Sequence, residues 1–232
     1  MPGNRMGKVQ PRRLRPTNVV GVIPGGDPAL RDEAVVIAAH YDHVGVGAPV
    51  NGDSIYNGAD DDASGVVTVL EMARALARGA PPRRTVVVLL TTGEEVGLLG
   101  TRWYIEHPRV PLARTVAQLE VEMSGRPDPL VGGAGRAWLT GYERSTLGPE
   151  LAKRGAKLVQ DPHPEQSFFT RSDNIQFARR GVVAHTVSSF GLHREYHQAS
   201  DELRHINITH MRDAIASLVE PVRWLTTTTD KP

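Results

Sequence analysis

Continuous apolar runs in the first half of the chain predict buried strands. Residues 34–39 and 86–90 are each long enough for a strand and too short for a helix, and neither run contains a polar residue. Clusters of Gly and Pro bound several such runs and predict turns. Together with weaker patterns elsewhere, these runs predict strands at 18–23, 34–40, 85–92, 115–123 and 182–187.

The predicted strand 115–123 differs from the others because it mixes apolar and polar residues. Apolar residues at 119, 121 and 123 alternate with Gln118, Glu120 and Glu122. Such alternation fits a strand with one face in water. It fits equally well a strand whose carboxyl end places Glu122 in a site.

Apolar residues at helical spacing lie between the predicted strands. The clearest helix runs from about Ser64 to Arg78, and the glycine and prolines of 79–82 end it. Further helices are predicted at 98–106, 146–155, 174–180 and 209–225. Strands that alternate with helices predict an α/β fold, here a three-layer α/β/α sandwich around a mainly parallel, mixed central sheet.

The patterned part of the chain predicts a single domain. A chain of 232 residues fits one domain, and no internal repeat or second domain is visible within 17–232. Residues 1–16 contain five basic residues and three prolines without apolar periodicity. We therefore expect them to be a poorly ordered lead-in.

Composition narrows the kinds of partner and site. The formal net charge is +1, from 27 basic and 26 acidic residues, which argues against nucleic acid or an anionic membrane as a partner. No apolar run approaches the roughly 20 residues of a membrane span, and no signal peptide is visible. The expectation is a chain without a membrane partner, and its location and oligomeric state stay open. Cysteine is absent, so a metal would have to be bound by histidine and carboxylate.

Glu94 and Glu95 stand directly after the apolar strand 85–92 and are the strongest candidates for chemistry. Two carboxylates at the end of a buried strand are costly unless a positive charge compensates them. The carboxyl ends of strands in an open α/β sheet are also where ligands bind. With Gly93 before and Gly97 after the pair, a turn can bring both side chains toward one cleft.

Other potential metal ligands follow predicted strands or lie in long loops. They are His40 with Asp42 two residues later, one aspartate of the run 60–62, Glu122, and His197. One edge of the sheet can bring these side chains together. Histidine and carboxylate ligands suit zinc or a neighbouring first-row metal. Three carboxylates and two neutral imidazoles would leave two divalent cations at a net charge of +1, so the charge fits two ions.

Five segments that contain these residues resemble, in their order along the chain, one known family. They are 39–42, 58–65, 92–97, 119–123 and 196–201. The chain resembles the metallo-aminopeptidases with two co-catalytic zinc ions, which are similar to peptidase family M28. The resemblance implies the zinc-exopeptidase type of α/β/α sandwich, also called phosphorylase/hydrolase-like, and peptides as substrates.

The same resemblance implies a role for each matching residue. His40 and Glu122 would bind one zinc, Glu95 and His197 the other, and Asp61 would bridge the two. Co²⁺ or Mn²⁺ could replace the zinc ions. Asp42 would orient His40, Glu94 would be the general base, and the Asp61–Asp62 peptide would be cis.

Substrate contacts are expected from Arg171, His193 and Tyr196, although a packing role suits Tyr196 equally well. In many relatives an aspartate stands where this chain has Glu122, and a glutamate there accompanies carboxypeptidase activity. The alternatives to an aminopeptidase are therefore a carboxypeptidase, a single-zinc glutaminyl cyclase and a non-catalytic binding relative. Many such relatives are secreted or periplasmic.

Overall fold

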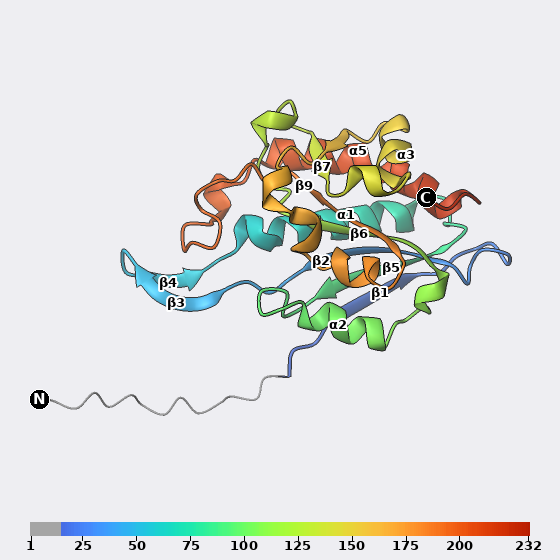
Figure 1. Ribbon diagram of the computed structural model, residues 1–232, viewed down its shortest axis with the longest axis horizontal. Coiled ribbons are helices and arrows are strands. Elements are labelled where there is room, and N and C mark those ends of the chain that lie inside the picture. Colours follow the sequence, from blue (N-terminus) through green and yellow to red (C-terminus); the bar gives the residue numbers. More distant parts are fainter. Residues whose placement is uncertain (1–14) are drawn as a thin grey trace, which may run out of the picture.

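A seven-stranded sheet forms the middle layer of the molecule in the computed structural model, which describes residues 15–232 (Figure 1). The strand order is β1-β5-β2-β6-β9-β7-β8. The strands in this order are Val19–Ile23, Thr85–Thr91, Ala34–His40, Thr115–Glu122, Val183–Ser188, Ala137–Leu139 and Leu158–Gln160. Residues 15–16 of the expected lead-in carry no regular structure, and its residues 1–14 lie outside the described residues.

The sheet is mixed, with its parallel part in the centre. Strands β5, β2, β6 and β9 run parallel to one another, so their carboxyl ends share one edge. Strand β1 pairs antiparallel with β5, and β7 pairs antiparallel with β9. The fold class expected from the sequence is confirmed.

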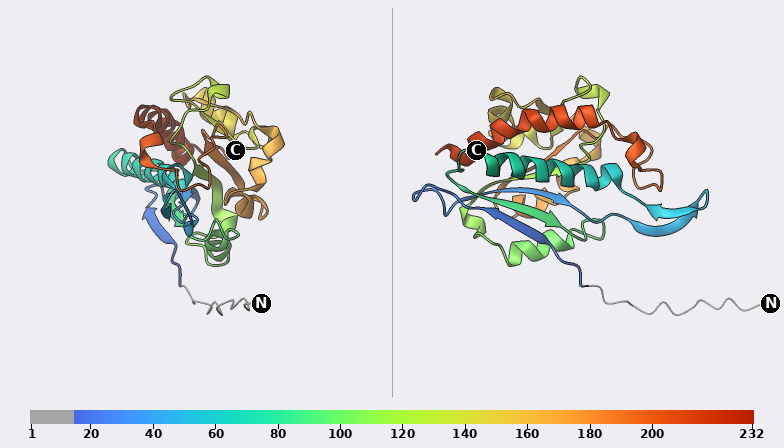
Figure 2. Two further views of the ribbon diagram at one scale, coloured as in Figure 1. Left: turned by 90° about the vertical axis from the view of Figure 1, so that its left-hand side faces the viewer. Right: turned by 180° about the vertical axis from the view of Figure 1, so that it is seen from behind.

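Helices cover both faces of the sheet, as two further views show (Figure 2). Helices α1 (Gly65–Arg78), α3 (Leu147–Lys153) and α5 (Ile208–Thr227) lie on one face. Helices α2 (Leu99–Glu106) and α4 (Asn174–Ala178) lie on the other. The two outer layers leave the carboxyl edge of the central strands between them, and loops surround that edge.

Alternate residues of the central strands fill two separate apolar cores. On β2, Val35 and Ile37 pack in the core beneath α1, α3 and α5, whereas Val36 and Ala38 pack beneath α2 and α4. This alternation explains the continuous apolar run, because both faces of the strand are buried.

Strand β6 is also buried on both faces, despite its polar residues. Gln118 and Glu120 are fully buried on the side of α2 and α4, where the Gln118 amide donates a hydrogen bond of 2.7 Å to Glu120. The interpretation of this segment as a strand with one face in water is therefore wrong.

A β-hairpin of β3 (Gly45–Val50) and β4 (Asp53–Tyr56) was not expected from the sequence. It projects from the body of the molecule as a separate two-stranded sheet (Figure 1). Asn51 and Gly52 form its turn, and both have positive φ. Asn-Gly is a typical hairpin turn, but the glycine-rich sequence around it obscured this signal.

Burial of Leu119 in the centre of β6 predicts a large effect of truncation. We expect Leu119→Ala to lower the free energy of unfolding by about 2–5 kcal/mol, because a fully enclosed side chain leaves a cavity. The control Val46→Ala, on a hairpin residue that is 80% exposed, should change it by less than about 0.5 kcal/mol. Urea unfolding followed by circular dichroism measures both, and equal effects would contradict the assigned core.

Candidate metal centre

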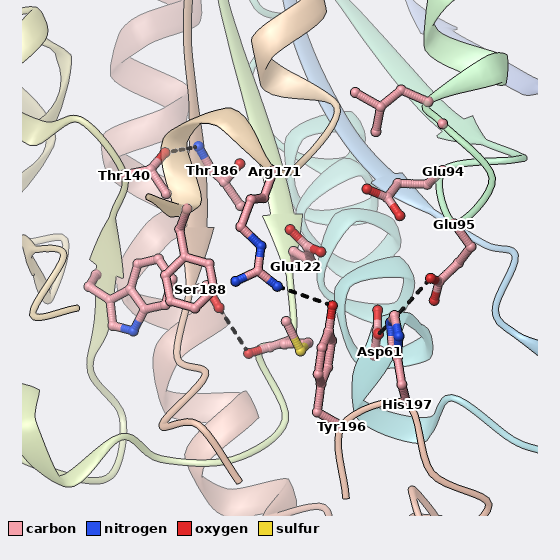
Figure 3. A pocket seen from close by; sticks show the side chains of 15 residues that line it. Asp61, Glu94, Glu95, Glu122, Thr140, Arg171, Thr186, Ser188, Tyr196 and His197 are labelled. Carbon is pink, nitrogen blue, oxygen red and sulfur yellow. Dashed lines mark hydrogen bonds and ion pairs between the residues drawn. The ribbon is translucent and has the colours of Figure 1, made fainter. Parts of the chain in front are cut away.

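The carboxyl edge of the parallel strands brings the predicted ligands together, and Figure 3 labels all of them except His40. His40 ends β2 and Glu122 ends β6, while Glu95 lies in the turn that follows β5. Asp61 lies at a kink with non-helical backbone in the segment Ala59–Ser64 that precedes α1, and His197 lies in the loop after β9. Five segments that are distant in sequence therefore converge on one site.

Asp61 stands between two groups of possible ligands. Its Oδ1 is 3.2 Å from His40 Nε2, and that nitrogen is 3.7 Å from Glu122 Oε1. Its Oδ2 is 3.0 Å from His197 Nε2, and that nitrogen is 3.1 Å from Glu95 Oε2. Each oxygen of Asp61 thus faces a different group, which is the arrangement that a bridging carboxylate requires.

Several atoms at the centre lack the partners that buried polar atoms normally have. His40 Nε2, Asp61 Oδ2 and Glu95 Oε1 are buried without a hydrogen bond to any described residue. A buried polar atom without a partner costs roughly 1–3 kcal/mol, so such atoms call for an explanation. Metal ions would satisfy all three, and histidine with carboxylate is a donor set that zinc accepts.

His43 belongs to the group around Glu95, although the sequence interpretation gave it no role. Its Nδ1 is 2.9 Å from Glu95 Oε1 and 3.7 Å from Asp61 Oδ2. Together with His197, these residues form a group of four potential ligands, whereas His40, Asp61 and Glu122 form a group of three. The available signal was a second histidine three residues after His40.

The Asp201 carboxylate holds the backbone at Asp60 and Asp61 in place. The Asp201 carboxylate accepts hydrogen bonds from the backbone amides of Asp60 and Asp61, at 3.0 to 3.1 Å. The next carboxylate, Asp62, accepts from the amides of Gly65 and Met123. The Asp61–Asp62 peptide is cis, as the family resemblance implied.

Asp42 contacts His40 through a different atom from the one expected. His40 Nδ1 lies 3.0 Å from the backbone carbonyl oxygen of Asp42, whereas the nearest carboxylate oxygen is 3.9 Å away. The carboxylate instead accepts from the amides of Glu94 and Glu95, at 3.2 and 3.4 Å. The carbonyl therefore orients the imidazole and leaves Nε2 facing Asp61, while the carboxylate fixes the turn after β5.

Glu94 lines the cleft beside the two ligand groups, close to other negative charges (Figure 3). Burial raises the pKa of Glu94 to about 9 in the metal-free protein, and repulsion from Glu122 and Asp173 contributes to the increase. With this pKa, Glu94 is protonated at neutral pH in the metal-free protein. Cations at the neighbouring ligand groups would lower the pKa and free the carboxylate to accept a proton.

The pKa values of Glu95 and His197 are shifted in favour of the charged forms, whereas that of Glu94 is shifted in favour of the neutral form. Burial alone would raise the pKa of Glu95, but the imidazoles of His197 and His43 lower it to about 2. The carboxylates of Asp61 and Glu95 raise the pKa of His197 to about 10. In the metal-free protein, protonated histidine thus supplies the positive charge at the centre.

The three predicted substrate contacts do not all line the cleft. Arg171 and Tyr196 do, with Arg171 Nη2 3.4 Å from the Tyr196 hydroxyl (Figure 3). The Tyr196 ring also stacks on the His197 ring, with centroids 3.9 Å apart. His193 is not among the lining residues, and its Nε2 lies 2.9 Å from Asp60 Oδ2 instead. This contact places His193 behind the centre, so its expected position in the cleft is corrected.

Apolar and hydroxyl-bearing side chains line the part of the cleft that the potential ligands do not. Met123, Trp138 and Phe168 line it together with the hydroxyl-bearing residues Thr140, Thr186 and Ser188. The whole cleft has a volume of about 270 Å³, enough for a small side chain or part of a peptide.

Comparison with known proteins identifies the family of this arrangement. The sequence model of "Peptidase family M28" matches residues 18–220. A protein of Penicillium rubens named "Vacuolar membrane protease" is 30% identical over 215 residues, which are 90% of this chain and 20% of that protein. The chain thus spans about one fifth of this relative.

Solved structures share the fold at lower sequence identity. A zinc aminopeptidase from Bacillus subtilis superposes with a TM-score of 0.73 at 21% identity, covering 93% of this chain and 51% of that one. A glutaminyl cyclase from Porphyromonas gingivalis superposes with a TM-score of 0.65 at 17% identity, covering 88% of this chain and 76% of that one.

The names of the relatives do not agree with the expectation that the chain has no membrane partner. Their name associates them with a vacuolar membrane, so the comparisons do not support that expectation. Within residues 15–232, none of the helices is both long and apolar enough to cross a membrane.

The raised pKa of Glu94 predicts how pH affects stability without metal. The folded-state pKa of Glu94, about 9, exceeds the ordinary value of 4.5. The contribution of Glu94 to the free energy of unfolding is therefore fully present below about pH 4.5 and is lost as the pH rises toward 9. Glu94→Gln removes this loss, so the melting temperature of the variant should increasingly exceed that of the wild type from pH 5 to 9.

Thermal unfolding with a chelator present measures this difference. Glu143→Gln, at a largely exposed glutamate, is the control and should follow the wild type across the pH range. A difference between Glu94→Gln and wild type that stays constant with pH would contradict the raised pKa.

Proposed function

The chain belongs to peptidase family M28, and from this premise we propose that it is a zinc-dependent aminopeptidase that removes N-terminal residues from peptides. The observation that carries the proposal is the position of Asp61. Its two carboxylate oxygens face separate ligand groups, one with His40 and one with His197, so that two ions could share one bridging residue.

In this proposal, His40, Asp61 and Glu122 would bind one zinc ion, and Asp61, Glu95 and His197 would bind the other. Co²⁺ or Mn²⁺ are possible substitutes. When bound, the ions would lower the pKa of a water at the centre and polarise the scissile carbonyl group. The orphaned buried atoms of His40, Asp61 and Glu95 support this assignment, because an ion at each position would satisfy them.

Glu94 is proposed to move the proton. It would accept a proton from the attacking water and donate it to the amine that leaves when the peptide bond breaks. Its position beside Glu95 places its carboxylate in the cleft without making it a member of either ligand group. Burial favours the protonated form of Glu94 and so drives the first transfer, whereas the greater basicity of the leaving amine drives the second.

The remaining cleft residues would bind the peptide. The apolar wall of Met123, Trp138 and Phe168 is suited to the side chain of the N-terminal residue. Arg171 and Tyr196 would contact the peptide backbone beyond it, with Tyr196 also packing on the ligand His197. His193 would support the centre through Asp60.

Arg171 also favours a second candidate, a carboxypeptidase. Its guanidinium group could bind the C-terminal carboxylate of a peptide. The fold shared with a glutaminyl cyclase suggests a third candidate, although Glu122 completes a second ligand group that a single-zinc enzyme does not need. The protease name of the relatives supports hydrolysis over cyclisation, and their membrane association remains open for this chain.

Metal content and substrate direction test the proposal together. We expect about two zinc ions per chain by elemental analysis, together with chelator-sensitive release of an N-terminal residue from aminoacyl anilides. Peptides with an acetylated N-terminus are the control and should not be cleaved. Cleavage of the acetylated peptides at the C-terminus would favour the carboxypeptidase, and cyclisation of N-terminal glutamine with one zinc per chain would favour the cyclase.

Glu94→Gln tests the general base. The variant should lose about 100- to 10,000-fold in kcat, the typical contribution of general acid–base catalysis, while it keeps both metal ions. Glu106→Gln, at an exposed position on α2, is the matched control and should retain full activity. A Glu94→Gln variant with wild-type kcat would assign proton transfer to another group.

A further inference from the structure

His43 contacts the centre as closely as the predicted ligands do. It lies three residues after His40, in the segment between β2 and β3. Its Nδ1 is 2.9 Å from Glu95 Oε1 and 3.7 Å from Asp61 Oδ2. Glu95 therefore has an imidazole nitrogen near each oxygen, since His197 Nε2 is 3.1 Å from Oε2.

The short distance between His43 and Glu95 does not correspond to a hydrogen bond. Neither His43 Nδ1 nor Glu95 Oε1 has a hydrogen-bond partner among the described residues, despite a separation of 2.9 Å. His40 Nε2 shows the same combination of close carboxylates and no hydrogen bond. A nitrogen and an oxygen that lie this close without hydrogen-bond geometry fit two ligands of the same metal ion.

The surroundings of His43 hold its ring in this position. The side chain is only 7% exposed, and its ring meets the His197 ring edge-on at 5.5 Å. Gly58, with φ of 62°, packs against it, and a Cβ at this position would be 2.6 Å from His43 Cγ. Any other residue at 58 would push the imidazole away, so the glycine makes room for it.

We propose that His43 Nδ1 is a fourth protein ligand in the ion position formed by Asp61, Glu95 and His197. This inference rests on the proposed two-metal function. Donor atoms about 2.0–2.1 Å from a tetrahedral zinc ion lie roughly 3.3 Å from one another. The two imidazole nitrogens lie 2.9 to 3.7 Å from the nearest oxygens of Asp61 and Glu95, distances close to that value, and all the ligand atoms of the group lie within 4.8 Å of one another.

The two ion positions are then unequal. The position with His43 has four protein ligands, whereas the position of His40, Asp61 and Glu122 has three and keeps a place open for water or substrate. A closed set of four ligands is typical of tightly held zinc, and three ligands with an open place are typical of catalytic zinc. The first equivalent of metal should therefore bind at the His43 position and more tightly than the second.

Zinc titration of the metal-free protein in competition with a chromophoric chelator tests this prediction. We expect two equivalents of distinct affinity in the wild type. In His43→Ala, the tighter affinity should fall by more than about 100-fold, above the 10- to 100-fold typical of residues that only support a ligand. The weaker affinity should stay within a few-fold of its wild-type value.

A second variant separates a ligand from a hydrogen-bond donor. His43→Asn places an amide near the position of Nδ1, so it can donate to Glu95 but does not replace an imidazole ligand. If His43 is a ligand, Asn should bind metal as poorly as Ala, and the visible absorption of the first Co²⁺ equivalent should change in both variants. Recovery of the tight affinity in His43→Asn would overturn the proposal in favour of a positioning role.

The controls distinguish the possible failures. His107→Ala, at an exposed histidine on the end of α2, should leave both affinities unchanged, and circular dichroism should show that every variant is folded. A wild-type chain that binds no zinc would refute the proposed function. A wild type that binds two zinc ions, with His43→Ala binding them equally well, would refute only the role of His43.

Discussion

The accumulation of buried carboxylates at the carboxyl edge of the sheet is the constraint on which the rest of the structure depends. Burial raises the pKa of Asp62, Glu120 and Asp173, and repulsion among the acidic groups adds to the increase. Such a concentration of negative charge in a poorly hydrated region destabilises the fold unless cations or donors compensate it. Oriented backbone amides provide part of that compensation, and the two groups of potential metal ligands are placed to receive cations that would provide the rest.

The three consecutive aspartates show how the compensation is divided. Asp60 accepts from the Gly125 amide and meets His193, whereas Asp61 faces both ligand groups. Asp62 turns away and accepts from backbone amides. Capping of helix α1 would account for one acidic residue at this position but not for three in succession. A different set of partners compensates each of them, and only the middle one is placed to bridge.

Most of the fold followed from local patterns, because strands buried on both faces have continuous apolar runs and α1 has a clear helical period. The buried strand β6 could be placed, but the burial of Gln118 and Glu120 could not, since it depends on α2 and α4 packing over them. The short strands β7 and β8 have three residues each and leave little pattern to detect.

The family resemblance predicted which residues converge at the sheet edge, whereas finer contacts could not be predicted. Which atom of Asp42 reaches His40 depends on the path of the chain after β2, and this path directs the carboxylate to the turn after β5. The position of His43 depends on the left-handed conformation of Gly58, a residue distant from it in sequence. Such contacts arise from tertiary structure, so no local pattern records them.

The β3–β4 hairpin connects His43 to the aspartate run, and its base is closed by the pairing of Gly45 with Tyr56. The chain therefore leaves the candidate metal centre after His43 and returns to it before the aspartate run, at nearly the same position. What lies beyond that pair, including the exposed Val46 and Ile55, is geometrically independent of the ligands. In evolutionary terms, the hairpin tip is a point at which a family member can gain length or a whole additional module while its metal centre keeps the same arrangement.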